Sequence, residues 1–162
     1  MPQKKVFENK LRLVTKTLPG TESVTVLILG GAGSRYETKK LNGISHFLEH
    51  MFFKGAKTYK TAKEVSEAVD SVGGDFNAFT GKEYVGYFIK VASRHLETAL
   101  DVLSDMLLHS KFDQGEIDKE RGVIMEEYNM YQDTPMYQVG WDFELLMYGD
   151  QPMGWDQVGT KE

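Results

Sequence analysis

The chain of 162 residues contains no cysteine. Without thiols it can form neither a disulfide framework nor a cysteine-ligated metal site, and it has no thiolate nucleophile. Long apolar runs are also lacking, since the longest uncharged apolar stretch, residues 24–29, is far too short to cross a bilayer. Because no basic and apolar segment of the signal-peptide kind opens the chain, we expect a cytoplasmic protein with no membrane partner.

Positive charge is scarce as well. Lys and Arg together number 19 against 24 Asp and Glu, which gives a formal net charge of -5. A chain without a basic stripe is a poor partner for a phosphate backbone, so we expect no nucleic-acid partner. With 41% hydrophobic residues, the composition excludes intrinsic disorder and suffices for one domain with its own core, whereas the length is too short for two ordinary domains.

Hydrophobic periodicity and turn residues predict groups of strands followed by groups of helices. The predicted strands span residues 5–7, 11–15, 23–29, 75–79 and 84–92, and the predicted helices span residues 44–53, 61–72, 93–109, 113–130 and 135–147. The absence of a βαβ alternation favours an α+β fold, with a mixed or antiparallel sheet packed by helices. We expect the strand at 23–29 to be buried. The apolar residues of 135–147 are expected to form core, and any exposed part of them could contribute to a domain interface.

Three helix starts carry capping signals, and we expect Ser93 to cap the helix predicted at 93–109. Thr61 is followed by Glu64, and Asp113 is followed by Glu116, which is the spacing of a capping box. We therefore predict that Thr61 and Asp113 are N-caps.

The most informative motif is His46-Phe47-Leu48-Glu49-His50. Residues four apart lie on the same face of an α-helix, so His46 and His50 can both bind one Zn²⁺ ion, and Glu49 lies at the edge of that face. The alternative interpretation is a pair of ordinary helix histidines beside a surface carboxylate.

The helix predicted at 113–130 offers a third ligand. Glu120 and Glu127 are seven residues apart and share a stripe with apolar residues such as Val123 and Tyr131. Carboxylates on a core-facing stripe are costly unless they are paired, protonated or bound to a metal. Alternatively, the helix is rotated and both carboxylates are solvated. Glu126 is expected on a more exposed side.

Together, these features resemble the inverzincin signature of the zinc metallopeptidases that include pitrilysin, insulysin and the mitochondrial processing peptidases. The flanking segments at residues 42–45, 51–55, 73–80 and 120–127 are similar to those of bacterial members, in the same order. The resemblance extends over nearly the whole chain. It implies the α+β domain of LuxS-like and processing-peptidase-like metalloenzymes.

The resemblance implies a role for each residue of the motif. His46, His50 and Glu127 correspond to the three protein ligands of a single Zn²⁺ ion, and Glu49 corresponds to the general base. Glu120 corresponds to a second acidic residue that supports the ligands. Such an enzyme is a zinc-dependent endopeptidase or oligopeptidase that hydrolyses extended peptides with a metal-activated water.

The segment Asn77-Ala78-Phe79 resembles the edge strand to which the peptide substrate adds in this family. From the residues alone, an ordinary edge strand is an equally good interpretation.

Members of the family resemble two tandem copies of one domain, and only the first copy carries zinc. Residues 1–162 correspond to one incomplete zinc-carrying copy, so we expect a missing C-terminal homologous domain as a partner. Pairing into a homodimer or heterodimer is a further expectation, and the isolated chain is expected to bind zinc but cleave slowly at best. The alternative is a non-catalytic family member or fragment that acts as a peptide-binding or structural subunit. All four key positions are kept, which favours the enzyme.

Overall fold

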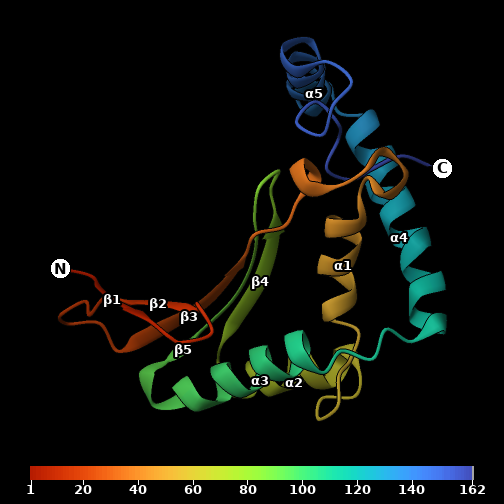
Figure 1. Ribbon diagram of the computed structural model, residues 1–162. Coiled ribbons are helices and arrows are strands. Elements are labelled where there is room, and N and C mark those ends of the chain that lie inside the picture. Colours follow the sequence, from red (N-terminus) through yellow and green to blue (C-terminus); the bar gives the residue numbers. More distant parts are fainter. Residues whose placement is uncertain (162) are drawn as a thin grey trace.

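The structure, a computed structural model, describes residues 1–161 (Figure 1). Its strands and helices follow one another in the predicted order. In sequence they are β1 (Gln3–Val6), β2 (Arg12–Thr15), β3 (Ser23–Gly30), α1 (Ile44–Phe52), α2 (Ala62–Asp70), β4 (Asp75–Thr80), β5 (Val85–Ala92), α3 (Leu96–Leu108), α4 (Gln114–Gln132) and α5 (Pro135–Tyr148). The predicted α+β class is therefore confirmed.

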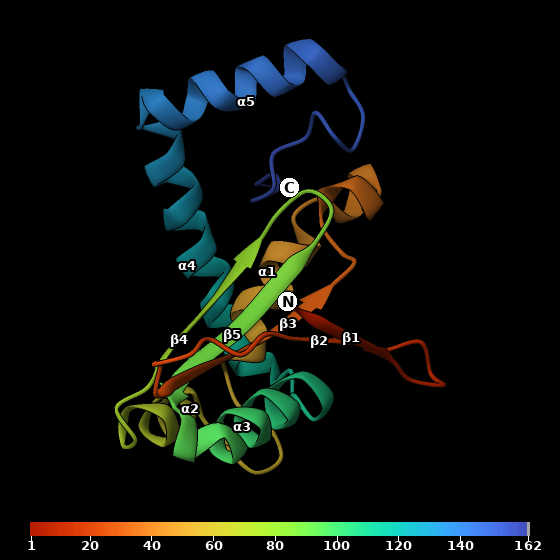
Figure 2. The same ribbon diagram turned by 90° about the vertical axis from the view of Figure 1, so that its left-hand side faces the viewer.

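The main sheet has three antiparallel strands in the order β3-β5-β4. Tyr87 of β5 lies opposite Ile28 of β3 and Ala78 of β4, which fixes the register. The strands β1 and β2 form a separate antiparallel pair. Figure 2 shows β4 at the edge of the sheet nearer to α4. This edge of β4 has no strand partner within residues 1–161.

The core lies between one face of the sheet and the helices α2 and α3. It is formed by alternate residues of β5 and by the apolar faces of the two helices: Val65, Val69, Val85, Tyr87, Ile89, Val91, Ala99, Val102, Leu103 and Met106. The expectation that the strand at 23–29 is buried was wrong: its residues alternate between exposed and half-buried. Leu27 and Leu29 are 46% and 60% exposed, because β3 is an edge strand with helices on one face only.

The helix α1 packs against β4 and α4, so it stands between the sheet and α4 (Figure 1). The N-terminus of α1 is capped by Glu37, which lies outside the helix. The Glu37 carboxylate accepts hydrogen bonds from the backbone N–H groups of Gly43 and Ser45, each at 2.8 Å, and from Asn42 Nδ2 at 3.1 Å. A carboxylate at a helix N-terminus satisfies free N–H groups and interacts favourably with the helix dipole.

The N-caps Thr61 and Asp113 are confirmed, whereas Ser93 does not cap α3, which begins at Leu96 after a 3-10 turn and has no side-chain cap. The Thr61 side chain accepts a hydrogen bond from the N–H of Glu64, and the Asp113 side chain accepts from the N–H groups of Gly115 and Glu116.

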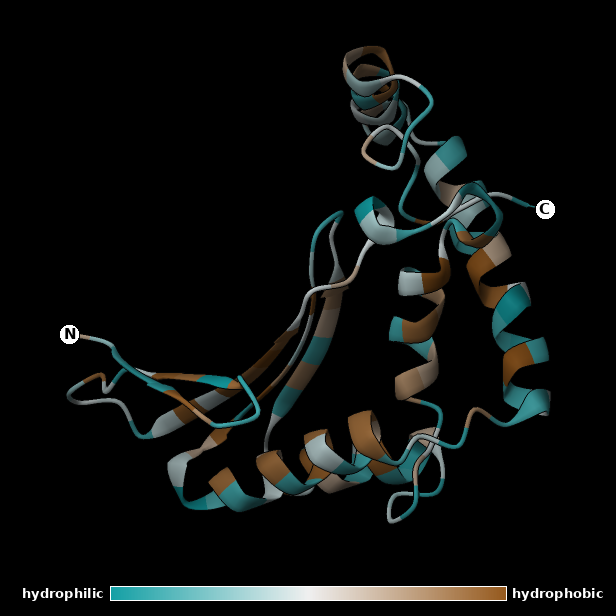
Figure 3. Cartoon of the chain, in the orientation of Figure 1, coloured by the Kyte–Doolittle hydropathy of each residue, from teal (hydrophilic) through white to brown (hydrophobic). Residues whose placement is uncertain are grey.

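The helix α5 does not join the core as expected. No residue of α5 is buried, and Phe143 and Leu146 are 61% and 82% exposed. The helix lies apart from the sheet, and Figure 3 shows apolar segments along it. The helix contacts α4, where the ring of Trp141 packs edge-on against that of Tyr131. Within residues 1–161, no helix is long and apolar enough to cross a membrane.

Candidate metal centre

Two helices bring the predicted metal ligands together. His46 and His50 lie on one face of α1, with their ring centroids 4.7 Å apart, and Glu127 faces them from α4. His46 Nε2 is 3.7 Å from Glu127 Oε1, and His50 Nε2 is 3.4 Å from Glu127 Oε2. One ligand atom from each residue lies within 4.8 Å of the others. The grouping inferred from the sequence therefore exists in space.

The spacing of these atoms fits a metal better than direct hydrogen bonds. Ligand atoms about 2.1 Å from a tetrahedral zinc ion lie about 3.4 Å from one another. The two nitrogen–oxygen distances, 3.7 and 3.4 Å, are close to this value and longer than an ordinary hydrogen bond. Two imidazoles and a carboxylate are also donors that zinc accepts.

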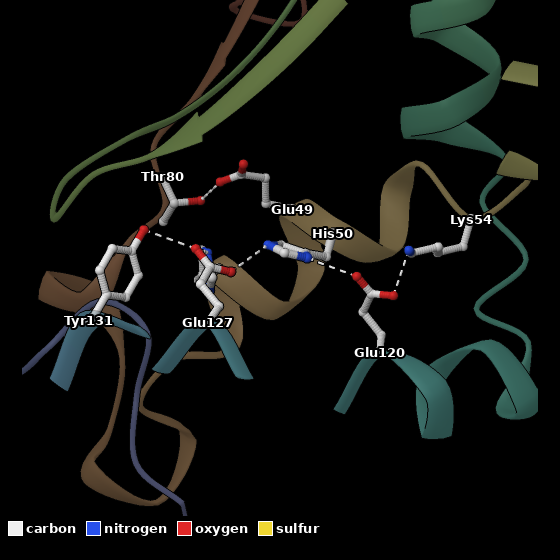
Figure 4. Close-up of polar contacts among 8 residues, drawn as sticks. Glu49, His50, Lys54, Thr80, Glu120, Glu127 and Tyr131 are labelled. Atoms are coloured by element: carbon white, nitrogen blue, oxygen red, sulfur yellow. Dashed lines mark hydrogen bonds and ion pairs between the residues drawn. The ribbon is translucent and has the colours of Figure 1, made fainter. Parts of the chain in front are cut away.

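Glu120 supports His50 from behind (Figure 4). The Nδ1–H group of His50 donates to Glu120 Oε1 at 2.8 Å, and Lys54 Nζ lies 2.5 Å from Glu120 Oε2. Glu120 is only 3% exposed, and a buried charge is costly unless it is paired. Lys54 and His50 supply that pairing. When the proton is held on Nδ1, the lone pair of Nε2 is free to bind a metal.

The orientation of α4 agrees with the prediction that Glu120 and Glu127 face inward. The alternative of a rotated helix with both carboxylates solvated is excluded by the burial of Glu120. Glu126 is exposed, as expected. Val123 was expected to face inward with the two carboxylates, but it is 50% exposed. The buried face of α4 is therefore narrower than the stripe of residues predicted from the sequence.

The charged groups of the centre shift one another's pKa values. Glu127, and then Glu120, raise the pKa of His50 against the opposing effect of burial. His50 in turn lowers the pKa of Glu127. Burial lowers the pKa of His46 despite the nearby Glu127. For Glu120, burial raises the pKa, but the contacts with Lys54 and His50 outweigh it and the net shift is downward.

Glu49 points from α1 towards β4. Its Oε2 accepts a hydrogen bond from Thr80 Oγ1 at the end of that strand (Figure 4). The same carboxylate is close enough to influence the pKa of His46 and of Tyr131. Glu49 therefore lies beside the predicted metal ligands.

Three residues of the centre were not singled out from the sequence as functional. They are Lys54, Thr80 and Tyr131. The hydroxyl of Tyr131 donates to Glu127 Oε1 at 2.9 Å, and burial together with this contact raises its pKa to about 12. Lys54 and Tyr131 each follow a predicted ligand by four residues, a spacing that could have identified them. Thr80 had no such local signal.

The strand β4 presents its two faces differently. Phe76, Ala78 and Thr80 face the helices, whereas Asp75, Asn77 and Phe79 are exposed on the outer face of the sheet. The Phe79 ring lies on Gly86 of β5, where a Cβ atom would come within 2.2 Å of it. The side chain of Phe79 thus points away from the predicted metal ligands.

The backbone of Ala78 lies on the free edge of β4. Gly81 N donates to Tyr84 O at 2.8 Å, so these two residues form a hydrogen-bonded pair at the hairpin end. Bonded and non-bonded pairs alternate along an antiparallel ladder, which assigns the backbone groups of Asn77 and Phe79 to β5. The N–H of Ala78 points outward and donates to Asn77 Oδ1 at 2.8 Å.

The model of the insulinase family, peptidase family M16, matches residues 12–145, which include all of these side chains. The chain belongs to peptidase family M16. It is 47% identical to an uncharacterised zinc protease of Bacillus subtilis, YmxG, over 155 residues that make up 96% of this chain and 38% of that protein. It is 45% identical to an uncharacterised zinc protease of Streptomyces coelicolor over 150 residues, 93% of this chain and 32% of that protein. The M16 chain thus spans about a third of the length of these relatives.

Solved structures share the fold. A protease from Helicobacter pylori matches 99% of this chain and 39% of its own, with a TM-score of 0.93 and 28% identity. The periplasmic protease PqqL from Escherichia coli matches 99% of this chain and 18% of its own, with a TM-score of 0.88 and 24% identity. The family match and these folds confirm the resemblance inferred from the HxxEH motif.

Proposed function

We propose that this chain is the zinc-binding domain of a zinc-dependent endopeptidase that cleaves extended peptides. Family membership supports peptide hydrolysis as the reaction. The observation that carries the proposal is the convergence of His46, His50 and Glu127 on one point, with nitrogen–oxygen distances of 3.7 and 3.4 Å.

In this proposal His46, His50 and Glu127 would hold the zinc ion. When bound, the ion would supply a water whose pKa is lowered to about 7. Glu49 is the general base: it takes a proton from the attacking water and passes it to the leaving amine. Glu120 keeps His50 in the tautomer that presents Nε2, and Tyr131 holds one oxygen of Glu127.

We further propose that the peptide binds as an added strand along the free edge of β4. The N–H and C=O of Ala78 would form main-chain hydrogen bonds with it, which gives affinity without strict sequence selectivity. In the peptide-free chain the N–H of Ala78 is bonded to Asn77 Oδ1, so the substrate would displace this side chain. Asn77 and Phe79 then flank the contact, and the Asn77 amide is available to the peptide.

Because the chain spans about a third of its relatives, the whole protein would contain further chain outside this domain. We propose that this includes the second homologous domain, and that it completes the substrate site. The domain by itself would bind zinc and cleave slowly.

Zinc content measured on purified protein tests the metal site. The unmodified chain and Glu126→Ala should each contain one zinc ion per chain, whereas Glu127→Ala should contain almost none. Glu126 is the matched control, because it is exposed on the same helix and does not face the histidines. Equal zinc content in all three proteins would refute Glu127 as a ligand.

Hydrolysis of fluorogenic peptides tests the activity. The full-length protein should cleave them, EDTA should abolish cleavage, and Glu49→Gln should keep its zinc and lose about 100-fold or more in rate. A zinc-loaded full-length protein that cleaves no unfolded peptide would favour the non-catalytic, peptide-binding alternative. Strong EDTA-sensitive cleavage by the 162-residue chain alone would refute the need for a second domain.

A further inference from the structure

Thr80 is the last residue of β4, and its side chain lies on the partly buried face of the sheet, towards the helices. Its Oγ1 donates a hydrogen bond to Glu49 Oε2 (Figure 4). No other side chain within residues 1–161 donates a hydrogen bond to this carboxylate. The contact therefore joins α1 to the edge strand β4 at Glu49, the proposed general base.

We propose that Thr80 is the positioning residue that holds Glu49 in the orientation for proton transfer, an inference that rests on the proposed function. Glu49 has three rotatable side-chain bonds, and a hydrogen bond to one oxygen restricts where the other can lie. With Oε2 bound to Thr80, Oε1 is left to accept the proton of the attacking water. Threonine suits this role because its branched Cβ restricts the direction of the hydroxyl.

The position of Thr80 is itself fixed by the hairpin that follows. Lys82, in the β4–β5 turn, bonds to the carbonyl oxygen of Trp155 at 2.9 Å and to Glu144 of α5 at 2.8 Å. The side chain of Lys82 is only 9% exposed. These contacts tie the end of the hairpin to the segment after α4, so the hydroxyl of Thr80 is presented from an anchored strand end.

This arrangement also couples the base to the substrate edge. Ala78 and Thr80 are two residues apart on the same strand, a separation of about 7 Å. A peptide that adds to β4 at Ala78 would be aligned with the strand whose last residue, Thr80, orients Glu49. Small shifts of the base relative to the peptide are costly, since a misplacement of about 1 Å can lower a rate about 100-fold.

The test compares three variants of the full-length protein. Thr80→Val removes the hydroxyl at nearly constant volume, Thr80→Ser keeps it, and Thr25→Val makes the same exchange at an exposed position of β3 in the same sheet. Thr80→Val should lower kcat about 10–100-fold with unchanged KM and zinc content. Thr80→Ser should retain most of kcat, and Thr25→Val should match the unmodified protein.

Two results would overturn the proposal. One is a kcat for Thr80→Val within about twofold of the unmodified protein at equal zinc content. The other is equal loss in Thr80→Ser and Thr80→Val, which would assign the effect to packing rather than to the hydroxyl.

Crystal structures supply a readout that does not depend on activity. The unmodified chain should show the Glu49 carboxylate on Thr80, and Thr80→Val should show it released into another orientation. If the unmodified full-length protein binds zinc but cleaves nothing, the proposed function fails, while this comparison still decides whether Thr80 orients Glu49. A Glu49 side chain turned away from Thr80 in the unmodified chain would refute the inference.

Discussion

Replacing Glu120 by glutamine tests whether the buried acid behind His50 controls metal affinity. Glu120 is 3% exposed and uses its two oxygens for two different donors, His50 at 2.8 Å and Lys54 at 2.5 Å. A glutamine side chain has a single acceptor oxygen. It can accept from His50 or from Lys54, but its NH₂ group then faces the other donor.

The expected loss follows from this mismatch. Removing the hydrogen-bond partner of a metal-bound histidine typically weakens metal affinity about 10–100-fold, or about 1.4–2.7 kcal/mol. For Glu120→Gln we expect a loss within this range, because the negative charge that makes His50 Nε2 more basic is gone while an imperfect acceptor remains. The three ligands themselves are unchanged, so zinc should still bind.

A competition titration with a chromophoric chelator at pH 7 measures the zinc dissociation constant of each variant. The matched control is Glu126→Gln, which removes the same charge from the exposed side of α4 and should bind zinc as the unmodified chain does. A dissociation constant for Glu120→Gln within about twofold of the control would refute the supporting role. An equal loss in both variants would show that net charge, rather than the contact with His50, sets the affinity.

Other parts of the chain give further predictions. Because the pKa of His50 is raised in the folded chain, the metal-free protein should lose stability as the pH rises above about 6.5 and through that pKa. The lowered pKa of His46 affects stability only below about pH 6.5. Urea unfolding in EDTA measures the free energy of unfolding, and a rise in that free energy above about pH 6.5 would contradict the prediction. Glu37→Gln should lower the free energy of unfolding by about 1–2 kcal/mol, because it removes the charge that caps α1. Gly86→Ala should destabilise by about 1–3 kcal/mol, since its Cβ would lie 2.2 Å from a facing aromatic ring. Gly122→Ala, on an exposed helix position with open space, should stabilise by about 0.5–1 kcal/mol, and urea midpoints compare the two.

Local features of the fold were predictable because they depend on neighbours in sequence. The caps at Thr61 and Asp113 bind N–H groups two or three residues away. The face shared by His46 and His50 follows from helical geometry alone. The order of strands and helices was also correct, since it follows from the periodicity of apolar residues.

Long-range features were not predictable in the same way. Nothing near α5 in sequence indicates that Phe143 and Leu146 are exposed, because burial depends on whether another element covers that face. The partial exposure of β3 likewise depends on which strands pair and on which side the helices lie. The cap that Glu37 provides to α1 crosses a loop and has no fixed spacing to recognise.

The amino-acid sequence by itself determined which residues could bind a metal and that two of them share one helical turn, because those properties belong to side-chain chemistry and to the 3.6-residue period of the helix. Only the tertiary structure decided that α4 presents Glu127 to that turn, that Glu120 stands behind His50 and pairs with Lys54, and that Thr80 of β4 reaches Glu49 of α1. These contacts join segments far apart in the chain. Packing of the helices against the sheet, rather than any local preference, brings them within bonding distance.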